Sequence, residues 1–289
     1  MKLVVHLLLV IMGPVFVGSS LRASPTSADV SYSLEKAPIF LPYTGARTSF
    51  GALRLKSMTP VVIYLHGCGG LHPYHDVLGW GQYVAEIGFL VVMPDSFARP
   101  SRRSNCDYQT KRTGAFVAAH EYRQQEINYT LEALRNTPFV DAAQIFLMGH
   151  SEGGVAVAVT RRSELRGLII TGWSCTCRAA SCEVESGILS PRSIPALAIG
   201  FRSDPWFTPA LQGRCIDWAR GRKVTQVEIK GEGHEADNEP EAKEAVFRFL
   251  SSLTEGHKIV RPKKIEIQIE STDEDEPLEE MSLPATPGS

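Results

Sequence analysis

The chain has 289 residues, with 30 Lys and Arg against 32 Asp and Glu, 43% hydrophobic and 21% charged residues. This balance is typical of a globular protein and excludes collagen, a coiled coil and wholesale disorder. Residues 24–255 carry equal numbers of basic and acidic side chains. Without a basic excess, this part gives no electrostatic basis for binding nucleic acid, and we expect a small-molecule partner instead.

Residues 1–23 have the organisation of a secretory signal peptide. Lys2 supplies the positive start, residues 3–17 are almost wholly apolar, and small residues suit cleavage after either Ser19 or Ala23. An uncleaved anchor is the weaker interpretation, because the apolar run is shorter than the roughly 20 residues that span a bilayer. We therefore expect a secreted or periplasmic protein, with no stable membrane span after signal cleavage and a main domain over residues 24–255.

Export changes how the six cysteines are interpreted. An even number in an oxidising compartment favours disulfides, although the sequence does not select among the pairings. The spacing of Cys175, Cys177 and Cys182 makes a local bridge one reasonable pairing. A zinc site is the alternative for this cluster, but the spacing lacks the paired Cys-x2-Cys form and no histidine lies nearby.

Strand-like and helix-like segments alternate from residue 61 onward. Short apolar runs predict buried strands at residues 61–65, 89–93, 145–148, 168–170 and 196–199, and a further strand-like run covers 224–229. Helical patterns are found at residues 77–87, 116–134 and 154–162. Such alternation is typical of parallel strands connected by helices. We expect an open α/β sheet, with the chemistry at the carboxyl ends of its strands.

A candidate nucleophile follows the third of these strands. The sequence Gly149-His150-Ser151-Glu152-Gly153 fits G-x-S-x-G, the nucleophile elbow, in which a sharp strand-to-helix turn exposes a serine hydroxyl. The motif alone is weakly specific, since a tight turn with a helix-capping serine would have the same sequence pattern. Its context favours the elbow, because a buried strand precedes it and a helix of small residues follows. We predict that Ser151 is the nucleophile.

A serine nucleophile needs a histidine base and a carboxylate that orients this base. After an elbow serine, the acid comes next in the chain and the histidine comes last. Two histidines follow Ser151: His234, on a glycine-flanked loop after a strand-like run, and His257, at the start of a polar tail where nothing nearby would hold it. For the acid, Asp204 follows a strand, whereas Asp217 lies in a segment that looks helical. We predict His234 as the base and Asp204 as the acid.

An oxyanion hole requires two N–H donors aimed at the carbonyl oxygen that becomes negative. One donor should be the backbone N–H of Glu152, the residue after the nucleophile. The other should come from the glycine-rich loop 66–70, where we choose the N–H of Cys68, with Gly69 as the alternative. Cys68 is not on an elbow, so we expect its sulfur to be structural and disulfide-bonded, not nucleophilic.

Together these motifs resemble the dienelactone hydrolase family of α/β hydrolases. The similarity covers roughly residues 55–250 and is carried by the loops 66–70 and 149–154, by Met93-Pro94-Asp95-Ser96-Phe97 and by the segment 123–141. It implies a mainly parallel, twisted sheet of about eight strands with helices on both faces. Dienelactone hydrolase itself has a cysteine nucleophile and is typically cytoplasmic, so Ser151 and the export signal point to an ester or lactone other than dienelactone.

We therefore expect an exported serine hydrolase that cleaves a carboxylic ester or lactone through an acyl-enzyme, without a metal or cofactor. Two alternatives stay open: a peptidase resembling the prolyl oligopeptidase group, and a catalytically silent binding protein with the same fold. The sequence does not indicate an oligomeric state.

Three further features concern the surroundings of the site. The stretch 96–115 is rich in basic residues, which we interpret as a solvated loop more readily than as a pocket wall. Arg123 and Glu126 are spaced as an ion pair on one helix. Aromatic candidates for the pocket lining, each of which would also fit the core or the rim, are Trp173, Trp206, His72 and Tyr74.

The segment 256–289 differs in composition from the main domain. It carries eight acidic against four basic residues, and it contains a short alternating run at 265–269 that would fit an edge strand. We expect an acidic, largely disordered tail and assign no chemistry to it.

Overall fold

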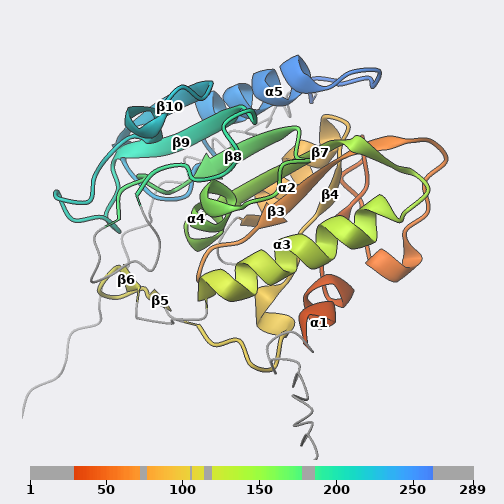
Figure 1. The fold of residues 1–289 in the computed structure, drawn as a ribbon, viewed down its shortest axis with the longest axis horizontal. Coiled ribbons are helices and arrows are strands. Elements are labelled where there is room, and N and C mark those ends of the chain that lie inside the picture. Colours follow the sequence, from red (N-terminus) through yellow and green to blue (C-terminus); the bar gives the residue numbers. More distant parts are fainter. Residues whose placement is uncertain (1–28, 72–76, 105, 114–118, 178–185, 263–289) are drawn as a thin grey trace, which may run out of the picture.

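A central sheet of eight strands organises the computed structural model, which describes residues 29–71, 77–104, 106–113, 119–177 and 186–262. In spatial order its strands are β10 (Val224–Glu232), β9 (Ala196–Ser203), β8 (Gly167–Thr171), β7 (Val140–His150), β3 (Thr59–Leu65), β4 (Leu90–Val92), β1 (Ile39–Phe40) and β2 (Arg47–Thr48). All pairings from β10 to β4 are parallel, whereas β1 pairs antiparallel with both β4 and β2. The expected open, mainly parallel α/β sheet is confirmed (Figure 1).

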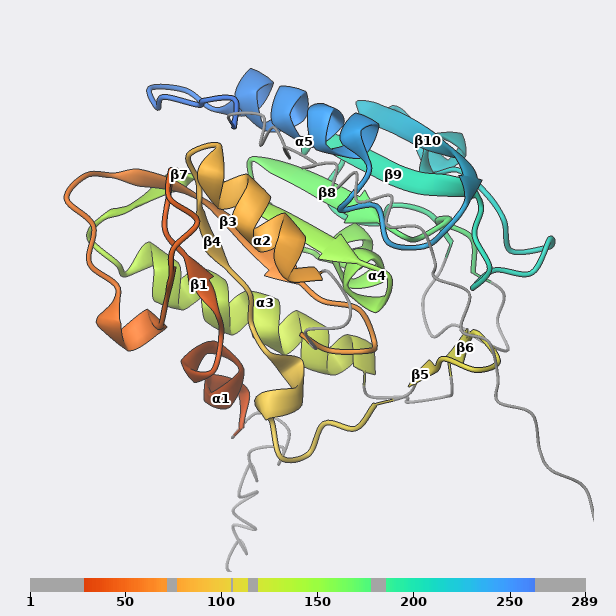
Figure 2. The same ribbon diagram turned by 180° about the vertical axis from the view of Figure 1, so that it is seen from behind.

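Helices cover both faces of this sheet, as expected. One face is covered by α1 (Val30–Glu35), α3 (Ala119–Arg135) and α4 (Glu152–Val159), and the other by α2 (Val77–Glu86) and α5 (Pro240–Leu253) (Figures 1 and 2). Strand β3 shows why its sequence is continuously apolar: Val61 and Ile63 join one hydrophobic core, whereas Val62 and Tyr64 join the other. A strand that is buried on both faces has no solvent-exposed face, so apolar and polar residues do not alternate along it.

The predicted elements differ from the observed ones mainly at the ends of strands and at the edge of the sheet. Strand β7 begins at Val140, before the apolar run predicted it, and it includes three partly or fully exposed residues at 141–143. Strands β1 and β2 have two residues each, too few for a periodicity to be recognised. The first three residues of the helix predicted from 116 lie outside the described residues.

Two disulfides are present among the described residues, Cys68–Cys106 and Cys175–Cys215. The first connects the glycine-rich loop after β3 to a separate hairpin of β5 (Cys106–Asp107) and β6 (Arg112–Thr113), which stands apart from the main sheet (Figure 2). The structural role expected for the Cys68 sulfur is confirmed. The local bridge considered for the loop of Cys175, Cys177 and Cys182 does not involve Cys175, which pairs with a residue 40 positions away. Cys177 is also disulfide-bonded, and Cys182 lies outside the described residues.

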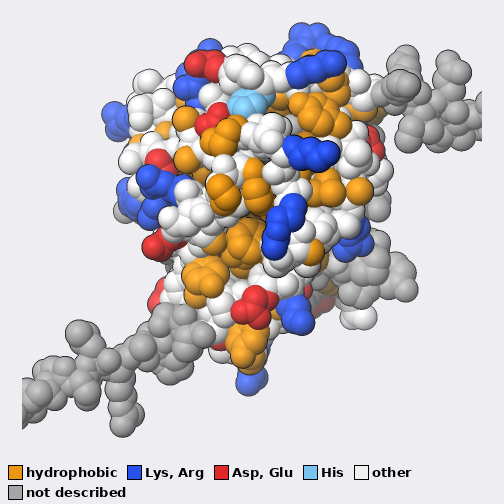
Figure 3. Space-filling view, turned by 90° about the vertical axis from the view of Figure 1, so that its right-hand side faces the viewer, with side chains coloured by type: hydrophobic (Ala, Val, Ile, Leu, Met, Phe, Trp, Pro, Cys, Tyr) orange, Lys and Arg blue, Asp and Glu red, His pale blue; other side chains and the backbone are white. Residues whose placement is uncertain are grey.

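Residues 256–262 lie against the main domain. The Tyr43 hydroxyl donates to the carbonyl of Lys258 at 2.9 Å, and the N–H of Val260 donates to the carbonyl of Ile87 at 3.0 Å. The segments expected to be a signal peptide (1–23) and the greater part of the tail (263–289) lie outside the described residues. Within the described ranges, no helix is both long and apolar enough to cross a bilayer. Figure 3 shows a face on which basic, acidic and hydrophobic side chains are interspersed.

Candidate active site

Ser151 occupies a strained turn between β7 and α4. Its backbone has φ 54° and ψ −117°, a region that residues with a side chain rarely adopt and that is commonly found at functional sites. The N–H of Ser151 donates to the carbonyl of Thr171 in β8 at 2.9 Å, which holds the turn in place. The side chain makes no capping hydrogen bond to α4, so the interpretation of Ser151 as a helix-capping serine is wrong.

Gly153 permits the close approach of α4 to β3 that this turn requires. A Cβ added at Gly153 would lie 2.1 Å from the carbonyl oxygen of Leu65. We expect Gly153→Ala to lower the free energy of unfolding by about 1–3 kcal/mol through overpacking, although alanine normally stabilises a helix by roughly 1 kcal/mol over glycine. Urea denaturation measures this. Gly200→Ala is the control, because a Cβ at Gly200 in β9 meets nothing within 4 Å; equal stability of the two variants would contradict the prediction.

Asp204 and His234 come together at the carboxyl ends of β9 and β10. Nδ1 of His234 lies 2.7 Å from Oδ2 of Asp204, and both side chains are buried. The other carboxylate oxygen of Asp204 accepts the N–H of Trp206 at 2.9 Å, which fixes the orientation of the carboxylate. Because an ionised carboxylate only accepts hydrogen bonds, His234 carries its proton on Nδ1 in this contact, and Nε2 is left as the basic nitrogen.

The competing residues lie elsewhere. Asp217 is exposed in a 3-10 helix, Cys215–Trp218, and pairs with Arg214 at 2.9 Å. His257 is held after all, contrary to expectation, since its Nε2 lies 2.7 Å from Oδ2 of Asp141. Asp141 is near the start of β7, however, whereas Ser151 follows the end of this 11-residue strand, so His257 is not at the elbow.

Ser151 and His234 line one pocket. Its other walls are the loop 67–70, His150, Glu235, Trp206 and Tyr108. Trp206 stacks on the His234 ring with centroids 5.4 Å apart, and Tyr108 meets Trp206 edge-on at 5.5 Å. The structure thus brings together the predicted nucleophile, base, acid and the Cys68 loop.

Among the aromatic candidates for the lining, Trp206 lines the pocket and Trp173 belongs to the hydrophobic core. His72 and Tyr74 lie outside the described residues. Sequence reasoning missed Tyr108, which the β5–β6 hairpin brings over the site. The available signal was its position two residues after Cys106, whose disulfide partner Cys68 is in the glycine-rich loop.

The expectation that the basic stretch 96–115 is solvated is confirmed for Arg103 and Lys111, which are exposed, and is wrong for Arg99 and Arg102. Arg99 and Arg102 are buried, at 1% and 5% exposure, and each is paired with carboxylates. Arg99 contacts Asp29 at 2.8 Å and Glu126 at 3.3 Å, whereas Arg102 contacts Glu152. Charges are tolerated inside a protein where partners compensate their desolvation, and those partners are remote in sequence.

Arg123 and Glu126 form the expected ion pair at 3.2 Å, but both are fully buried, and Arg123 also binds Glu152 at 2.8 Å. Burial by itself would raise the pKa of Glu152; the charges of Arg123 and Arg102 and their hydrogen bonds outweigh it and hold the pKa below its ordinary value. The side chain of Glu152 is therefore an ionised carboxylate beside the elbow.

His66, at the base of the glycine-rich loop, is buried and neutral. Burial first, and then the positive charge of Arg123, hold the pKa of His66 well below its ordinary value. Its Nε2 accepts the N–H of Ser96 at 3.0 Å, a bond that protonation would remove, and its Nδ1 contacts the carbonyl of Gly67 at 2.6 Å.

We expect this histidine to make folding sensitive to acid. The unfolded chain protonates His66 below about pH 6.5, while the folded protein does not. The contribution of His66 to stability is therefore fully present above that pH and is lost at up to about 1.4 kcal/mol per pH unit as the pH falls toward the folded pKa. The free energy of unfolding of His66→Gln, measured in urea from pH 7.5 to 5, should decline less steeply than that of the wild type. Parallel curves would show that His66 titrates alike in both states.

Within the described residues, His150, His234 and Glu235 could offer ligand atoms to a metal ion, since these atoms lie within 4.8 Å of one another. An ion there would take the Nε2 lone pair that acid–base chemistry at His234 requires.

The comparisons with known proteins agree with this fold. Residues 50–170 match the model of the dienelactone hydrolase family. A putative dienelactone hydrolase from Klebsiella pneumoniae is similar in structure, with a TM-score of 0.52 and 15% identity over 74% of this chain and 95% of the other. A dienelactone hydrolase-like promiscuous phosphotriesterase from metagenomic libraries has a TM-score of 0.50 and 15% identity, over 72% of this chain and 90% of the other. Among curated proteins, none matches the chain.

Proposed function

We propose that the chain, which has an α/β-hydrolase fold and matches the model of the dienelactone hydrolase family over residues 50–170, is a serine hydrolase that cleaves a carboxylic ester or lactone through an acyl-enzyme. The observation that carries the proposal is the contact of 2.7 Å between His234 and Asp204, at a pocket that also contains the strained Ser151.

In the proposed mechanism, Oγ of Ser151 attacks the substrate carbonyl while Nε2 of His234 accepts the hydroxyl proton. Asp204 accepts the hydrogen bond from Nδ1–H and stabilises the imidazolium that forms. The imidazolium then returns its proton to the departing alkoxide, which leaves an acyl group on Ser151. A water molecule, deprotonated by His234, hydrolyses this ester and restores the hydroxyl.

The oxyanion of both tetrahedral intermediates would be held by the backbone N–H groups of Cys68 and Glu152. Cys68 lies in the pocket wall, and Glu152 is the first residue of α4, directly after the nucleophile. An added Cβ at Gly67 would lie 3.2 Å from Cβ of Ser151, so the glycine-rich loop passes close to the nucleophile. Such donors are usually worth about 2.7–4 kcal/mol each in the transition state.

Incubation with a fluorophosphonate probe tests the proposal, because an activated serine attacks phosphorus whereas an ordinary one does not. We expect stoichiometric labelling of the folded protein, mapped by mass spectrometry to the peptide that contains Ser151, and turnover of nitrophenyl esters of graded acyl length. Heat-denatured protein is the control. Folded protein that is not labelled would indicate a silent binding protein, and cleavage of peptides without cleavage of esters would indicate a peptidase.

Export is a further part of the proposal. Disulfides persist in oxidising compartments, and Cys68–Cys106 and Cys175–Cys215 support a secreted or periplasmic location. Amino-terminal sequencing of the protein recovered from its native host tests whether the residues up to Ser19 or Ala23 have been removed.

A further inference from the structure

The two proposed oxyanion donors lie on separate loops that leave the sheet side by side. Strands β3 and β7 pair as far as Leu65 and Gly149, and beyond these residues the two segments are no longer paired as strands. Cys68 and Glu152 both lie past this last pair. Strand pairing therefore does not fix the distance between their N–H groups, and side chains that contact both loops can do so.

Arg123 of α3 contacts both loops with one guanidinium group. Its Nε donates to a carboxylate oxygen of Glu152 at 2.8 Å, and a terminal nitrogen donates to the carbonyls of His66 at 2.8 Å and Gly67 at 3.3 Å. The guanidinium is completely inaccessible to solvent. Since the guanidinium group is planar and rigid, it fixes the spacing between the groups it binds.

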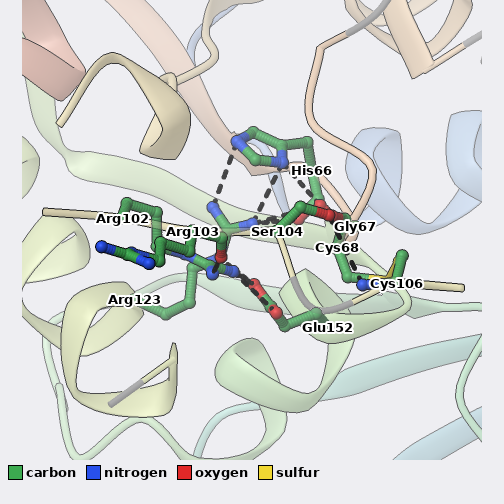
Figure 4. The surroundings of a disulfide bond; sticks show 9 residues. All are labelled: His66, Gly67, Cys68, Arg102, Arg103, Ser104, Cys106, Arg123 and Glu152. Atoms are coloured by element: carbon green, nitrogen blue, oxygen red, sulfur yellow. Dashed lines mark hydrogen bonds and ion pairs between the residues drawn. A yellow bond between two sulfur atoms is a disulfide. The ribbon is translucent and has the colours of Figure 1, made fainter. Parts of the chain in front are cut away.

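A second connection between the same loops involves Arg102, Ser104 and Cys106. Arg102 binds both carboxylate oxygens of Glu152, at 2.7 and 2.8 Å, and four residues later the disulfide Cys106–Cys68 reaches the other loop. Between them, the Ser104 hydroxyl donates to the carbonyl of Cys68 at 3.3 Å. Figure 4 shows these residues and Arg123 between Glu152 on one loop and His66, Gly67 and Cys68 on the other, so that the two connections and the two loops together form a ring.

We propose that this ring, composed of Arg123, Arg102, the Glu152 carboxylate and the Cys68–Cys106 disulfide, positions the two halves of the oxyanion hole. The inference rests on the proposed function. Arg123, Arg102 and Glu152 do not line the pocket. They are positioning residues, which, with the disulfide, act through the backbone N–H groups of Cys68 and Glu152. Because these N–H groups matter most when the carbonyl oxygen becomes negative, loosening the ring should slow the chemical step and leave substrate binding nearly unchanged.

The matched pair Glu152→Gln and Glu126→Gln tests the charged part of the ring. Both substitutions remove one carboxylate charge from Arg123, but Glu126 contacts Ser96, Arg99 and Arg123 and neither of the two loops. Loss of a whole oxyanion donor costs about 10²–10³ in kcat. For Glu152→Gln we expect a partial loss, roughly 10–100-fold in kcat with KM within about twofold. Glu126→Gln should stay within about threefold of the wild type in kcat.

A spectroscopic measurement separates positioning from a merely structural role. The carbonyl stretching frequency of the acyl-enzyme, measured by infrared difference spectroscopy, falls as the hydrogen bonds to the carbonyl oxygen strengthen. We expect a shift to higher frequency in Glu152→Gln and the wild-type frequency in Glu126→Gln. Should Glu152→Gln fail to fold, Arg102→Lys, which keeps the charge but loses the bidentate geometry, takes its place with the same expected direction.

The disulfide part is tested by two double variants. Cys68→Ser with Cys106→Ser opens the ring, and we expect a lower kcat and a higher carbonyl frequency. Cys175→Ser with Cys215→Ser removes a disulfide outside the ring, and we expect a lower melting temperature with an unchanged carbonyl frequency.

If folded Glu152→Gln and the Cys68/Cys106 variant keep the kcat and carbonyl frequency of the wild type, the ring is only structural and the inference is overturned, while the proposed function stands. If the wild type itself is neither labelled by fluorophosphonate nor hydrolyses esters, the proposed function is overturned, and the inference that rests on it is overturned as well.

Discussion

Ser151→Ala will reduce ester hydrolysis by about 10³–10⁶-fold and abolish fluorophosphonate labelling. The hydroxyl is the group that forms the acyl-enzyme, and without it only water can attack a carbonyl held in the oxyanion hole. The strained backbone at φ 54° stays accessible to alanine to the same extent as to serine, so the fold should persist. Steady-state hydrolysis of a nitrophenyl ester and gel-based labelling measure the two effects.

The matched control is Ser174→Ala. Ser174 is buried near the end of β8, and its hydroxyl accepts the N–H of Thr176 without lining the pocket. This variant should keep both labelling and turnover. Labelling that survives in Ser151→Ala would show that another residue is the nucleophile.

Asp204→Asn will reduce kcat/KM by about 10⁴-fold. The change is nearly isosteric, so the site should keep its shape. An amide placed 2.7 Å from Nδ1 of His234 can donate its N–H there, however, which favours the tautomer with its proton on Nε2. A histidine in that tautomer cannot accept the proton of Ser151, and the positive charge of the imidazolium loses its counter-ion.

Asp217→Asn is the control for the acid. Its carboxylate is exposed and pairs with Arg214 at the surface, so its loss should change kcat/KM by about twofold or less. Equal, mild losses in the two variants would mean that the carboxylate assigned here is not the catalytic one. The pH–rate profiles of both variants give a second measurement, because they report the ionisation of the catalytic base.

The arrangement of the main sheet could be predicted from the sequence because its central strands are buried on both faces. Residues 61–65 and 145–148 are continuous apolar runs, and the hydrophobic cores on the two faces require this. Strands β1 and β2 could not be predicted, since segments of two residues, such as Ile39–Phe40, show no periodicity. The positions of Asp204 and His234 followed from one rule, that side chains after parallel strands meet at the same edge.

The charged groups around the elbow could not be located from the sequence. Arg102 and Glu152 are 50 residues apart, and Arg123 and Glu152 are 29 apart, so no local spacing connects them. A basic stretch between two structured elements usually faces water, and only the tertiary fold shows that Arg99 and Arg102 do not. The cysteine pairing was undetermined for the same reason, because both observed bridges close loops of about 40 residues.

The order of the strands divides the proposed site between two environments of unequal rigidity. Ser151 follows β7, which has β3 on one side and β8 on the other, whereas His234 follows β10, which pairs with β9 on one side and with no described strand on the other. Amide protons at the rim of a sheet exchange with solvent through local fraying, while those at its centre wait for global opening. At low denaturant concentration, the hydroxyl of Ser151 would therefore keep its position while the imidazole of His234 is displaced. Activity would then be lost before the core unfolds.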